Sequence, residues 1–388
     1  LSGGVGTNLP AGQAFDLVQD PTNPRRLFTV IANRGVYRSL DFGETWERVS
    51  DIFVNAAMTS AGNAELAINP FGNVFVAIVQ NRRLAQLYRS DEQQATWVAI
   101  DLPTTDEESR VFGIHPGGQG NTHLSLAADP VNSNVCYIGG DRQARNQQDT
   151  PEQSYPNSIG SQASTGRLFR VDASLPNGEQ ARPITDNFTA TGTAPHADSR
   201  DMDFDANGVL VEGNDGGVYK QTAPQGSEGD WFSLNGNIGV TEIHSADWDA
   251  VSKVVVAGLQ DNGTTHQMNT GNSTWDNISN ADGGEVEIDD RSSENGSTRF
   301  TSNQNFRSFR KRVYDPSNQH MSRAAPALID LMADTILANF DFVNPVELNR
   351  ADPQRMVISH PNGIYESFDQ GETFRWVPGL SLAFCDNP

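Results

Sequence analysis

The stretch GVYRSLDFGETW, residues 35–46, returns near the other end of the chain as GIYESFDQGETF, residues 363–374. Both contain S-x-D-x-G-x-T followed by Trp or Phe, and a worn copy, LYRSDEQQATW at 87–97, keeps the Ser, Thr and Trp without the Gly. Asp and Ser side chains accept hydrogen bonds from backbone amides in tight turns, and Gly supplies a positive φ. The pattern therefore predicts a structural hairpin turn rather than a catalytic site.

Other repeat units become visible around this turn. Short turns such as DPTNP (20–24), NPFGN (69–73) and DPVNS (129–133) lie between β-rich apolar runs, and a further short strand follows each run. That further strand carries an aromatic residue or its equivalent at seven places: Tyr37, Tyr88, Phe169, Tyr219, His266, Phe309 and Tyr365. The intervals are 51, 81, 50, 47, 43 and 56 residues, and propeller blades are four-stranded and of comparable length.

This spacing predicts an all-β fold, a seven-bladed β-propeller of four-stranded antiparallel blades that forms a single domain over residues 1–388. The polar, pattern-free segment at about 143–165 is predicted to be a loop inserted in blade three. A short helix is expected at about 323–338, between blades six and seven. His266 stands where other blades carry Tyr or Phe, so a packing role is expected for it.

The repeated turn resembles the Asp-box family of β-propellers, also called the bacterial neuraminidase repeat family. The turns GNDGGVY (213–219), GLQDNGT (258–264) and DGG (282–284) resemble a subgroup that includes glycoside hydrolases and sortilin-type receptors. The resemblance covers nearly the whole chain and implies a propeller fold. In that subgroup these turns recur around the axial mouth, and they indicate the fold much more specifically than the activity.

Composition excludes some classes of partner. The 388 residues carry a formal charge of −22 and a pI near 4.6, so nucleic-acid phosphates would be repelled. No run of 18 apolar residues occurs, so no membrane span is predicted. The opening LSGGVGTNLP lacks the basic and apolar regions of a signal peptide. Cys136 and Cys385 are expected either to form one bridge or to remain two thiols.

Strand order predicts which turns share one end of the blades. With strands A to D counted from the axis outward, the B–C turns and D–A links lie at one end, and the A–B and C–D turns lie at the other. The Asp-box turns are C–D turns and belong to the second end. The first end collects acidic and histidine residues from blades four to six and arginines from blades one to three.

Converging polar groups at a propeller mouth indicate a binding site, although Asn-Gly and Asp-Gly pairs are also ordinary turn formers. The catalytic candidates are four carboxylates and one imidazole: Asp198, Asp215, Asp261, Asp282 and His196. The substrate-binding candidates are cationic or amide side chains on neighbouring turns: Arg34, Arg82, Arg142, His123, Asn214 and Gln260.

Two chemistries remain open for these residues. Two carboxylates on opposite sides of a sugar would act as acid and base, or as acid and nucleophile, of a glycoside hydrolase. A polysaccharide lyase would instead use His196 or His123 as the base, while arginines bind a uronate or sulfate. The F/Y-R-I-P motif of sialidases is absent, so sialidase activity is not expected.

The run DMDFDANG, residues 201–208, invites a calcium interpretation. Asp203, Asp205 and Asn207 match the first ligands of a calcium loop, but the later acidic ligand is missing. An ordinary A–B turn is the other interpretation. Calcium is the one cofactor that the sequence suggests, and none is required.

The functional expectation is an extracellular propeller that binds or cleaves glycan, with acidic polysaccharide as one candidate, at the end opposite the Asp-box turns. The alternative is a non-enzymatic module that binds a protein or peptide as part of a larger surface protein. A purely structural repeat is the third interpretation. In each case secretion or a cell-surface location is expected, with a glycan or a surface protein as partner.

Overall fold

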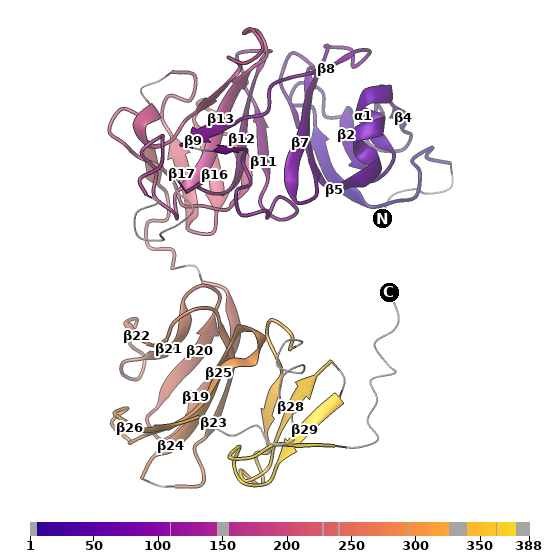
Figure 1. The fold of residues 1–388 in the computed structure, drawn as a ribbon. Helices are drawn as coiled ribbons and strands as arrows, with labels where there is room; N and C mark the ends of the chain where they lie inside the picture. Colours follow the sequence, from indigo (N-terminus) through magenta and orange to yellow (C-terminus); the bar gives the residue numbers. More distant parts are fainter. Residues whose placement is uncertain are drawn as a thin grey trace. The chain divides into compact units, whose positions relative to one another are not determined.

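The structure is a computed structural model that describes residues 6–108, 110–145, 155–226, 229–239, 241–293, 295–325, 340–361 and 363–377. The chain divides into two compact units, unit 1 (Leu1–Gly239) and unit 2 (Val240–Pro388). Figure 1 shows the strands of each unit, with unit 1 in indigo to pink and unit 2 in salmon to yellow.

Unit 1 contains four antiparallel four-stranded sheets, each with its strands in chain order. Blade one consists of β1 (Ala14–Gln19), β2 (Leu27–Ile31), β3 (Gly35–Ser39) and β4 (Glu47–Arg48). Blade two consists of β5 (Ala61–Ile68), β6 (Val74–Gln80), β7 (Arg83–Ser90) and β8 (Trp97–Ala99). Blade three consists of β11 (Ser125–Ala128), β12 (Val135–Arg142), β13 (Gly166–Asp172) and β14 (Ala181–Pro183). Blade four consists of β15 (Ser199–Phe204), β16 (Leu210–Asn214), β17 (Gly217–Gln221) and β18 (Trp231–Ser233).

Unit 2 contains three sheets of the same kind. Blade five consists of β19 (Ile243–Asp249), β20 (Val254–Leu259), β21 (Gly263–Gln267) and β22 (Trp275–Ser279). Blade six consists of β23 (Gly283–Asp289), β24 (Ser297–Asn303), β25 (Arg307–Tyr314) and β26 (His320–Ala324). Blade seven consists of β27 (Val346–Leu348), β28 (Met356–His360), β29 (Gly363–Ser367) and β30 (Arg375–Trp376).

Seven consecutive four-stranded antiparallel sheets confirm the predicted all-β fold of seven propeller blades. The seven predicted third strands are all present, as β3, β7, β13, β17, β21, β25 and β29. The innermost strands β1, β5, β11 and β15 lie side by side in unit 1, and β19, β23 and β27 do so in unit 2. The grouping of residues 1–388 into a single domain stays a prediction.

The two complete Asp-box turns have the predicted hydrogen bonds. Ser39 Oγ accepts from the Gly43 amide at 2.8 Å, and Asp41 Oδ1 accepts from the Thr45 amide at 2.9 Å. Hydrogen bonds from Thr45 and Ser39 lower the pKa of Asp41 to about 2. The second copy repeats the first bond at 2.8 Å, from the Gly371 amide to Ser367 Oγ. Each turn joins the third and fourth strands of its blade, so the motif is structural.

The worn copy in blade two keeps the turn by other means. Gln94 takes the left-handed conformation that Gly has in the complete copies, with φ of 59°. Asp91 supplies the carboxylate, which accepts from the Ala95 amide at 2.8 Å and from the Thr96 amide at 3.0 Å. The geometry of the turn therefore survives the loss of its glycine.

Several elements in the links between the blades of unit 1 were not predicted. Helix α1 (Ile52–Ala57) and the 3-10 helix η1 (Met58–Ser60) link blade one to blade two, and the Asp51 side chain caps α1. A two-stranded hairpin, β9 (Thr105–Glu107) and β10 (Arg110–Phe112), lies in the link from blade two to blade three. This hairpin and the predicted loop between β12 and β13 together explain the 81-residue interval between Tyr88 and Phe169.

The cores lie between neighbouring blades because each sheet presents apolar side chains to both faces. Between blades one and two the buried residues include Phe28, Val30, Val36, Leu66, Val76 and Ile78. Between blades two and three they include Phe75, Ala77, Leu87, Leu126, Ile138 and Phe169. In unit 2, Phe300, Phe309, Ile358, Tyr365 and Phe374 form the core between blades six and seven.

Carboxylates on two innermost strands connect blade one to blade two and blade five to blade six. Asp16 Oδ2 accepts from the Leu66 amide at 2.7 Å in unit 1, and Asp247 Oδ2 accepts from the Ile288 amide at 3.0 Å in unit 2. An innermost strand is a sheet edge whose amides lack a strand partner, so an acidic side chain from the preceding blade satisfies them. These acids are structural, and they were not predicted from the sequence.

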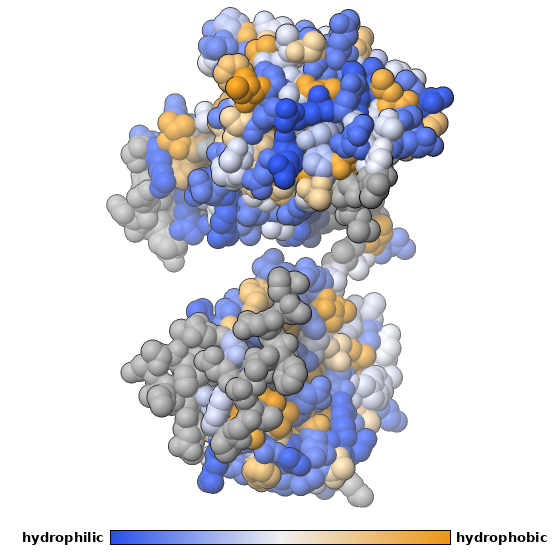
Figure 2. All heavy atoms as spheres, turned by 90° about the vertical axis from the view of Figure 1, so that its right-hand side faces the viewer, coloured by the Kyte–Doolittle hydropathy of each residue, from blue (hydrophilic) through white to orange (hydrophobic). Residues whose placement is uncertain are grey.

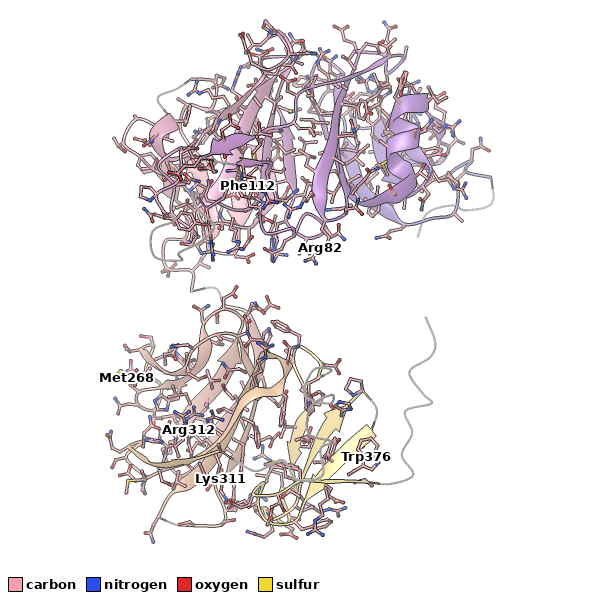
Figure 3. The ribbon with its side chains drawn as sticks, viewed as in Figure 1. Arg82, Phe112, Met268, Lys311, Arg312 and Trp376 are labelled. Atoms are coloured by element: carbon pink, nitrogen blue, oxygen red, sulfur yellow. The ribbon has the colours of Figure 1, made fainter. Side chains whose placement is uncertain are left out.

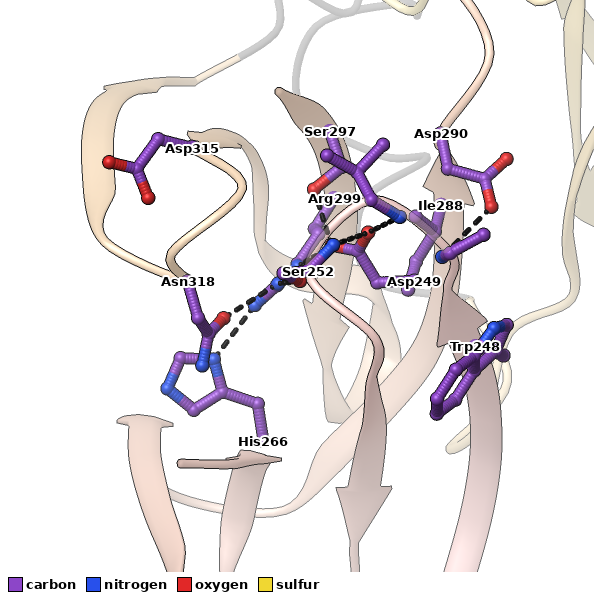
Figure 4. A network of polar contacts seen from close by, with 12 residues as sticks. Trp248, Asp249, Ser252, His266, Ile288, Asp290, Ser297, Arg299, Asp315 and Asn318 are labelled. Atoms are coloured by element: carbon purple, nitrogen blue, oxygen red, sulfur yellow. Dashed lines mark hydrogen bonds and ion pairs between the residues drawn. The ribbon is translucent and has the colours of Figure 1, made fainter. Parts of the chain in front are cut away.

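Blades five and six share a buried charged network around Arg299 (Figure 4). Arg299 is fully buried and donates to Asp249 at 2.7 Å, to Ser252 at 2.7 Å and to Asn318 at 2.7 Å. His266 Nδ1 lies 2.7 Å from the guanidinium, and the Tyr314 ring lies under it at 3.9 Å. His266 is 5% exposed, which confirms its predicted packing role and adds that of hydrogen-bond acceptor.

The predicted helix and one of the two cysteines lie largely outside the described residues. The helix expected at about 323–338 falls almost entirely outside them, and Ala324 ends strand β26. Cys136 is a buried free thiol whose pKa is raised by burial, and Cys385 lies outside the described part of the chain.

The face of unit 1 in Figure 2 is mostly hydrophilic, with hydrophobic side chains scattered between the polar ones.

Candidate functional site

The predicted residues of unit 1 lie at one end of its blades, where the B–C turns meet the D–A links. The Gly120 amide, in the link to blade three, donates to the Arg82 carbonyl in the B–C turn of blade two at 3.0 Å. The Ala197 amide, in the link to blade four, donates to the Ser164 carbonyl in the B–C loop of blade three at 2.9 Å. These contacts confirm that links and B–C turns from neighbouring blades share one end.

Three of the predicted side chains come together there. His123 precedes β11, Asp198 precedes β15, and Asp215 lies in the β16–β17 turn. One ligand atom from each lies within 4.8 Å of the other two, and His123 Nε2 is 3.8 Å from Asp198 Oδ1. We refer to these three side chains as the His123 cluster. Within the described residues, this is the one group of three or more acidic, His or Cys side chains that meets this distance.

The His123 cluster contains buried polar atoms that the fold does not use. His123 is 4% exposed. Its Nδ1 and the Oδ1 of Asp198 are both buried and have no hydrogen-bond partner within the described part of the chain. Burial raises the pKa of Asp198, and the negative charge of Asp215 adds to this, while the nearby His123 opposes it. Asp198 also has a φ of 69°, a left-handed conformation that Asp tolerates better than most residues.

Arg200 holds the third member of the cluster and was not predicted. Its Nε and Nη2 both lie 3.0 Å from Asp215 Oδ1. Arg200 follows Ser199 in β15, directly after the link that carries Asp198. The only sequence signal for Arg200 as a site residue is its position two residues after Asp198. Its actual partner, Asp215, is brought close by the pairing of β15 with β16.

Two buried acids, Asp141 and Glu212, stabilise the segments that carry members of the cluster. Neither was predicted as a site residue. Asp141, at the end of β12, accepts from the Gly117 amide at 3.2 Å and from the Gln119 amide at 3.1 Å. Burial raises the pKa of Asp141. These bonds shape the link that carries His123.

Glu212 in β16 is the second of these acids. It is fully buried, and Asn214 Nδ2 donates to its Oε2 at 2.6 Å. Asn214 Oδ1 in turn accepts from the Gly216 amide at 2.8 Å. Burial raises the pKa of Glu212 to about 8. Asn214, predicted to bind substrate, therefore stabilises the turn that presents Asp215.

The predicted cationic residues lie around the same end of unit 1. Arg34 is in the β2–β3 turn, Arg82 is in the β6–β7 turn, and Arg142 ends β12; all three are exposed. Figure 3 shows Arg82 at the edge of unit 1. None of the three forms an ion pair with a described acid. His196 lies near the cluster and contributes to lowering the pKa of Asp198, against the larger effect of burial, which raises it.

The candidates in unit 2 form a separate arrangement. Asp282, which precedes β23, accepts through Oδ1 from Gln260 Nε2 at 2.7 Å and from the Asp261 amide at 2.9 Å. Gln260 Nε2 also lies 3.2 Å from Asp261 Oδ1. Asp282 thus joins the β20–β21 turn to the start of blade six. The prediction that acids of blades four to six face arginines of blades one to three stays a prediction.

The DMDFDANG segment forms the A–B turn of blade four. Asp205 Oδ1 accepts from the Asn207 amide at 2.8 Å and from the Val209 amide at 2.9 Å, and these bonds lower the pKa of Asp205. Asp203 lies in β15 and accepts from the Phe204 amide at 2.7 Å. These contacts are those of an ordinary A–B turn, the second of the two interpretations. Calcium binding at this turn stays a prediction.

A hollow of about 570 Å³ follows the innermost strands of unit 1. Its lining includes Asp16, Glu65, Arg200 and Asp201. Burial, together with the charges of Asp16 and Asp201, raises the pKa of Glu65 to about 9. Through Arg200 the hollow reaches the His123 cluster.

Comparison with known proteins gives a fold-level similarity only. No family model and no curated protein matches the chain. Solved structures similar to it include a GH74 enzyme from Niastella koreensis (13% identity, 93% of this chain and 55% of that one, TM-score 0.41). Others are the GH74 xyloglucanase from Xanthomonas campestris (13%, 94% and 64%, 0.40) and YCF48 from Cyanidioschyzon merolae (14%, 95% and 86%, 0.29). The chain thus spans little more than half of the first of these proteins.

The class defined by fold and site is a β-propeller with a polar cluster at one end of its blades. Membership in the Asp-box family stays a resemblance carried by the turns at 35–46 and 363–374. Within the described residues, no helix is long and apolar enough to cross a membrane.

Proposed function

We propose that the chain is a secreted or cell-surface propeller that binds a glycan at the end of unit 1 that bears the His123 cluster. The observation that carries the proposal is the convergence of an imidazole and two carboxylates within 4.8 Å, with buried atoms that have no hydrogen-bond partner among the described residues. Such groups are costly to bury unless a partner compensates them. Sugar hydroxyls both donate and accept hydrogen bonds, so they are suitable partners.

The surroundings favour an acidic glycan. Exposed Arg34, Arg82 and Arg142 lie on turns at the same end of unit 1. A guanidinium binds a carboxylate or sulfate through two parallel hydrogen bonds. Because none of the three is paired with a described acid, each is available to a ligand.

Hydrolysis is a second candidate, and the distance between Asp198 and Asp215 favours it. One oxygen of Asp198 lies within 4.8 Å of one oxygen of Asp215. The carboxyl groups of retaining glycosidases are roughly 5–5.5 Å apart and those of inverting ones roughly 6.5–9.5 Å, so this closeness favours the retaining arrangement. In a retaining reaction Asp215 would attack the anomeric carbon while Asp198 protonates the leaving oxygen. Water would then cleave the ester, giving its proton to Asp198.

The test is a binding and cleavage screen on acidic and neutral polysaccharides, with products analysed by chromatography. Asp198→Asn and Asp215→Asn are expected to lose binding, and Glu92→Gln, an exposed carboxylate in the C–D turn of blade two, is the matched control. Cleavage with retained configuration would establish the hydrolase. Binding that is unchanged in both cluster variants would overturn the site, and a chain that binds no glycan would leave the surface-protein partner as the better function.

A further inference from the structure

We infer that His123, Asp198 and Asp215 form a binding site for one divalent transition-metal ion of the Zn²⁺ or Mn²⁺ class. The three residues come from separate segments: the link before β11, the link before β15 and the β16–β17 turn. The site therefore exists only where blades three and four meet.

The distances fit coordination better than direct hydrogen bonding. His123 Nε2 and Asp198 Oδ1 are 3.8 Å apart, which exceeds hydrogen-bonding range. Ligand atoms about 2.1 Å from one metal ion lie roughly 3–4 Å from each other. The pair is thus separated as two ligands of one ion would be, and Asp215 supplies a third within 4.8 Å.

Independent support comes from an unpartnered buried atom that faces the proposed ion. Asp198 Oδ1, the atom 3.8 Å from His123 Nε2, is buried and has no hydrogen-bond partner within the described residues. His123 is more than nine-tenths buried, and its second ring nitrogen, Nδ1, also has no partner there. Ordinary folding would pair such atoms or replace them with apolar groups. The nearby Asp141 shows this, since backbone amides satisfy its carboxylate.

The donor set selects the kind of ion. Calcium prefers six to eight oxygen ligands, and this group contains one imidazole and only two carboxylates. Imidazole suits zinc, and carboxylates also suit manganese. Both bonds from Arg200 go to Asp215 Oδ1, so they orient this carboxylate without using its Oδ2.

Three protein ligands leave open positions on the ion, as in catalytic zinc sites. Neighbouring hydroxyls or a carboxylate of a sugar would fill them, so the ion would hold the glycan. This role, unlike metal binding itself, rests on the proposed function. An occupied site would also use Asp198 and Asp215 as ligands, so binding without hydrolysis is the expected activity.

The experiment is a titration of the chelator-treated full chain with Zn²⁺, Mn²⁺ and Ca²⁺, followed by calorimetry and by equilibrium dialysis with metal analysis. One Zn²⁺ or Mn²⁺ per chain is expected. Asp215→Asn and His123→Ala should weaken binding more than about 100-fold, because losing even an outer partner of a metal ligand costs about 10–100-fold. Glu92→Gln and His320→Ala, which change an exposed carboxylate and an exposed imidazole outside the cluster, should bind as the parent does.

Because His123 is buried, its variant is accepted only if its circular dichroism spectrum matches the parent; Asp215→Asn, at an exposed residue, is the variant that decides. No stoichiometric Zn²⁺ or Mn²⁺ binding, binding of Ca²⁺ alone, or unchanged affinity in Asp215→Asn would overturn the site. Glycan binding that survives chelation would overturn the role of the ion but not the proposed function. Metal binding without any glycan binding would overturn the proposed function but not the metal site.

Discussion

Two polar clusters, one in each unit, both contain buried atoms but differ in how completely the fold satisfies them. In unit 2, Arg299 donates to Asp249, Ser252 and Asn318, and a ring nitrogen of His266 completes the set (Figure 4). In unit 1, His123 and Asp198 lie 3.8 Å apart, each with a buried atom that has no partner among the described residues. The first arrangement uses every group to hold two blades together. The second keeps groups free for a ligand, which is why we place function there.

The largest expected effect comes from breaking the satisfied network. Arg299→Leu leaves the Asp249 carboxylate buried without its cation, and breaking such a pair costs about 3–5 kcal/mol. Urea denaturation should therefore show a loss of this size. Arg355→Leu is the control, since the Arg355 side chain, which pairs with Glu366, is about half-exposed, and ion pairs that reach the solvent contribute about 0–1 kcal/mol. Equal losses in the two variants would remove the distinction between the clusters.

The satisfied network should also make stability depend on pH. Burial and the charge of Arg299 lower the pKa of His266 to about 4 from its ordinary 6.5. The unfolded chain thus binds the proton more readily, so this contribution is full above pH 6.5 and is lost as pH falls toward 4. The loss is at most about 3 kcal/mol. His266→Gln, which keeps an acceptor near Arg299, should flatten the profile between these pH values; an unchanged slope would assign it to other groups.

A matched pair of aspartates sharpens the comparison at the same position in two blades. Asp282 precedes the innermost strand of blade six and accepts two hydrogen bonds, while Asp198 precedes that of blade four and has an unpartnered oxygen. Asp282→Ala should lower the free energy of unfolding by about 1–3 kcal/mol. Asp198→Asn, which keeps a residue that tolerates the left-handed φ of 69°, should leave it unchanged or raise it. Thermal unfolding of both variants at low metal concentration tests this, and a larger loss for Asp198→Asn would show that Asp198 is structural.

At pH 5 the smallest expected effect is that of replacing Glu212, the buried acid that accepts a hydrogen bond from Asn214. Burial raises the pKa of Glu212 to about 8, so the folded chain holds this proton more tightly than the unfolded one. Its contribution is therefore full below pH 4.5 and is lost as pH rises through 8. Glu212→Gln should change stability by less than about 1 kcal/mol at pH 5 and should exceed the parent at pH 9. Denaturation at the two pH values decides, and a large loss at pH 5 would mean that Glu212 is ionised.

The site was predictable in part because turns are local. His123, Asp198 and Asp215 were singled out by their places in links and B–C turns, and these places are confirmed. Arg200, Asp141 and Glu212 were not, because their roles come from pairing and burial across strands that are distant in sequence. The same reason hid the carboxylates of Asp16 and Asp247, which satisfy amides of the following blade.

The sequence by itself determined the class of the fold. A turn motif at 35–46 and 363–374 and seven recurring third strands specified four-stranded antiparallel blades, because hairpin turns and strand alternation are encoded over a few residues. Only the tertiary structure decided which polar groups are satisfied. Asp282 and Asp198 occupy equivalent places in sequence, yet one carboxylate is bonded by the neighbouring turn and the other faces His123. That difference depends on how adjacent blades pack, and so does the metal site that we propose.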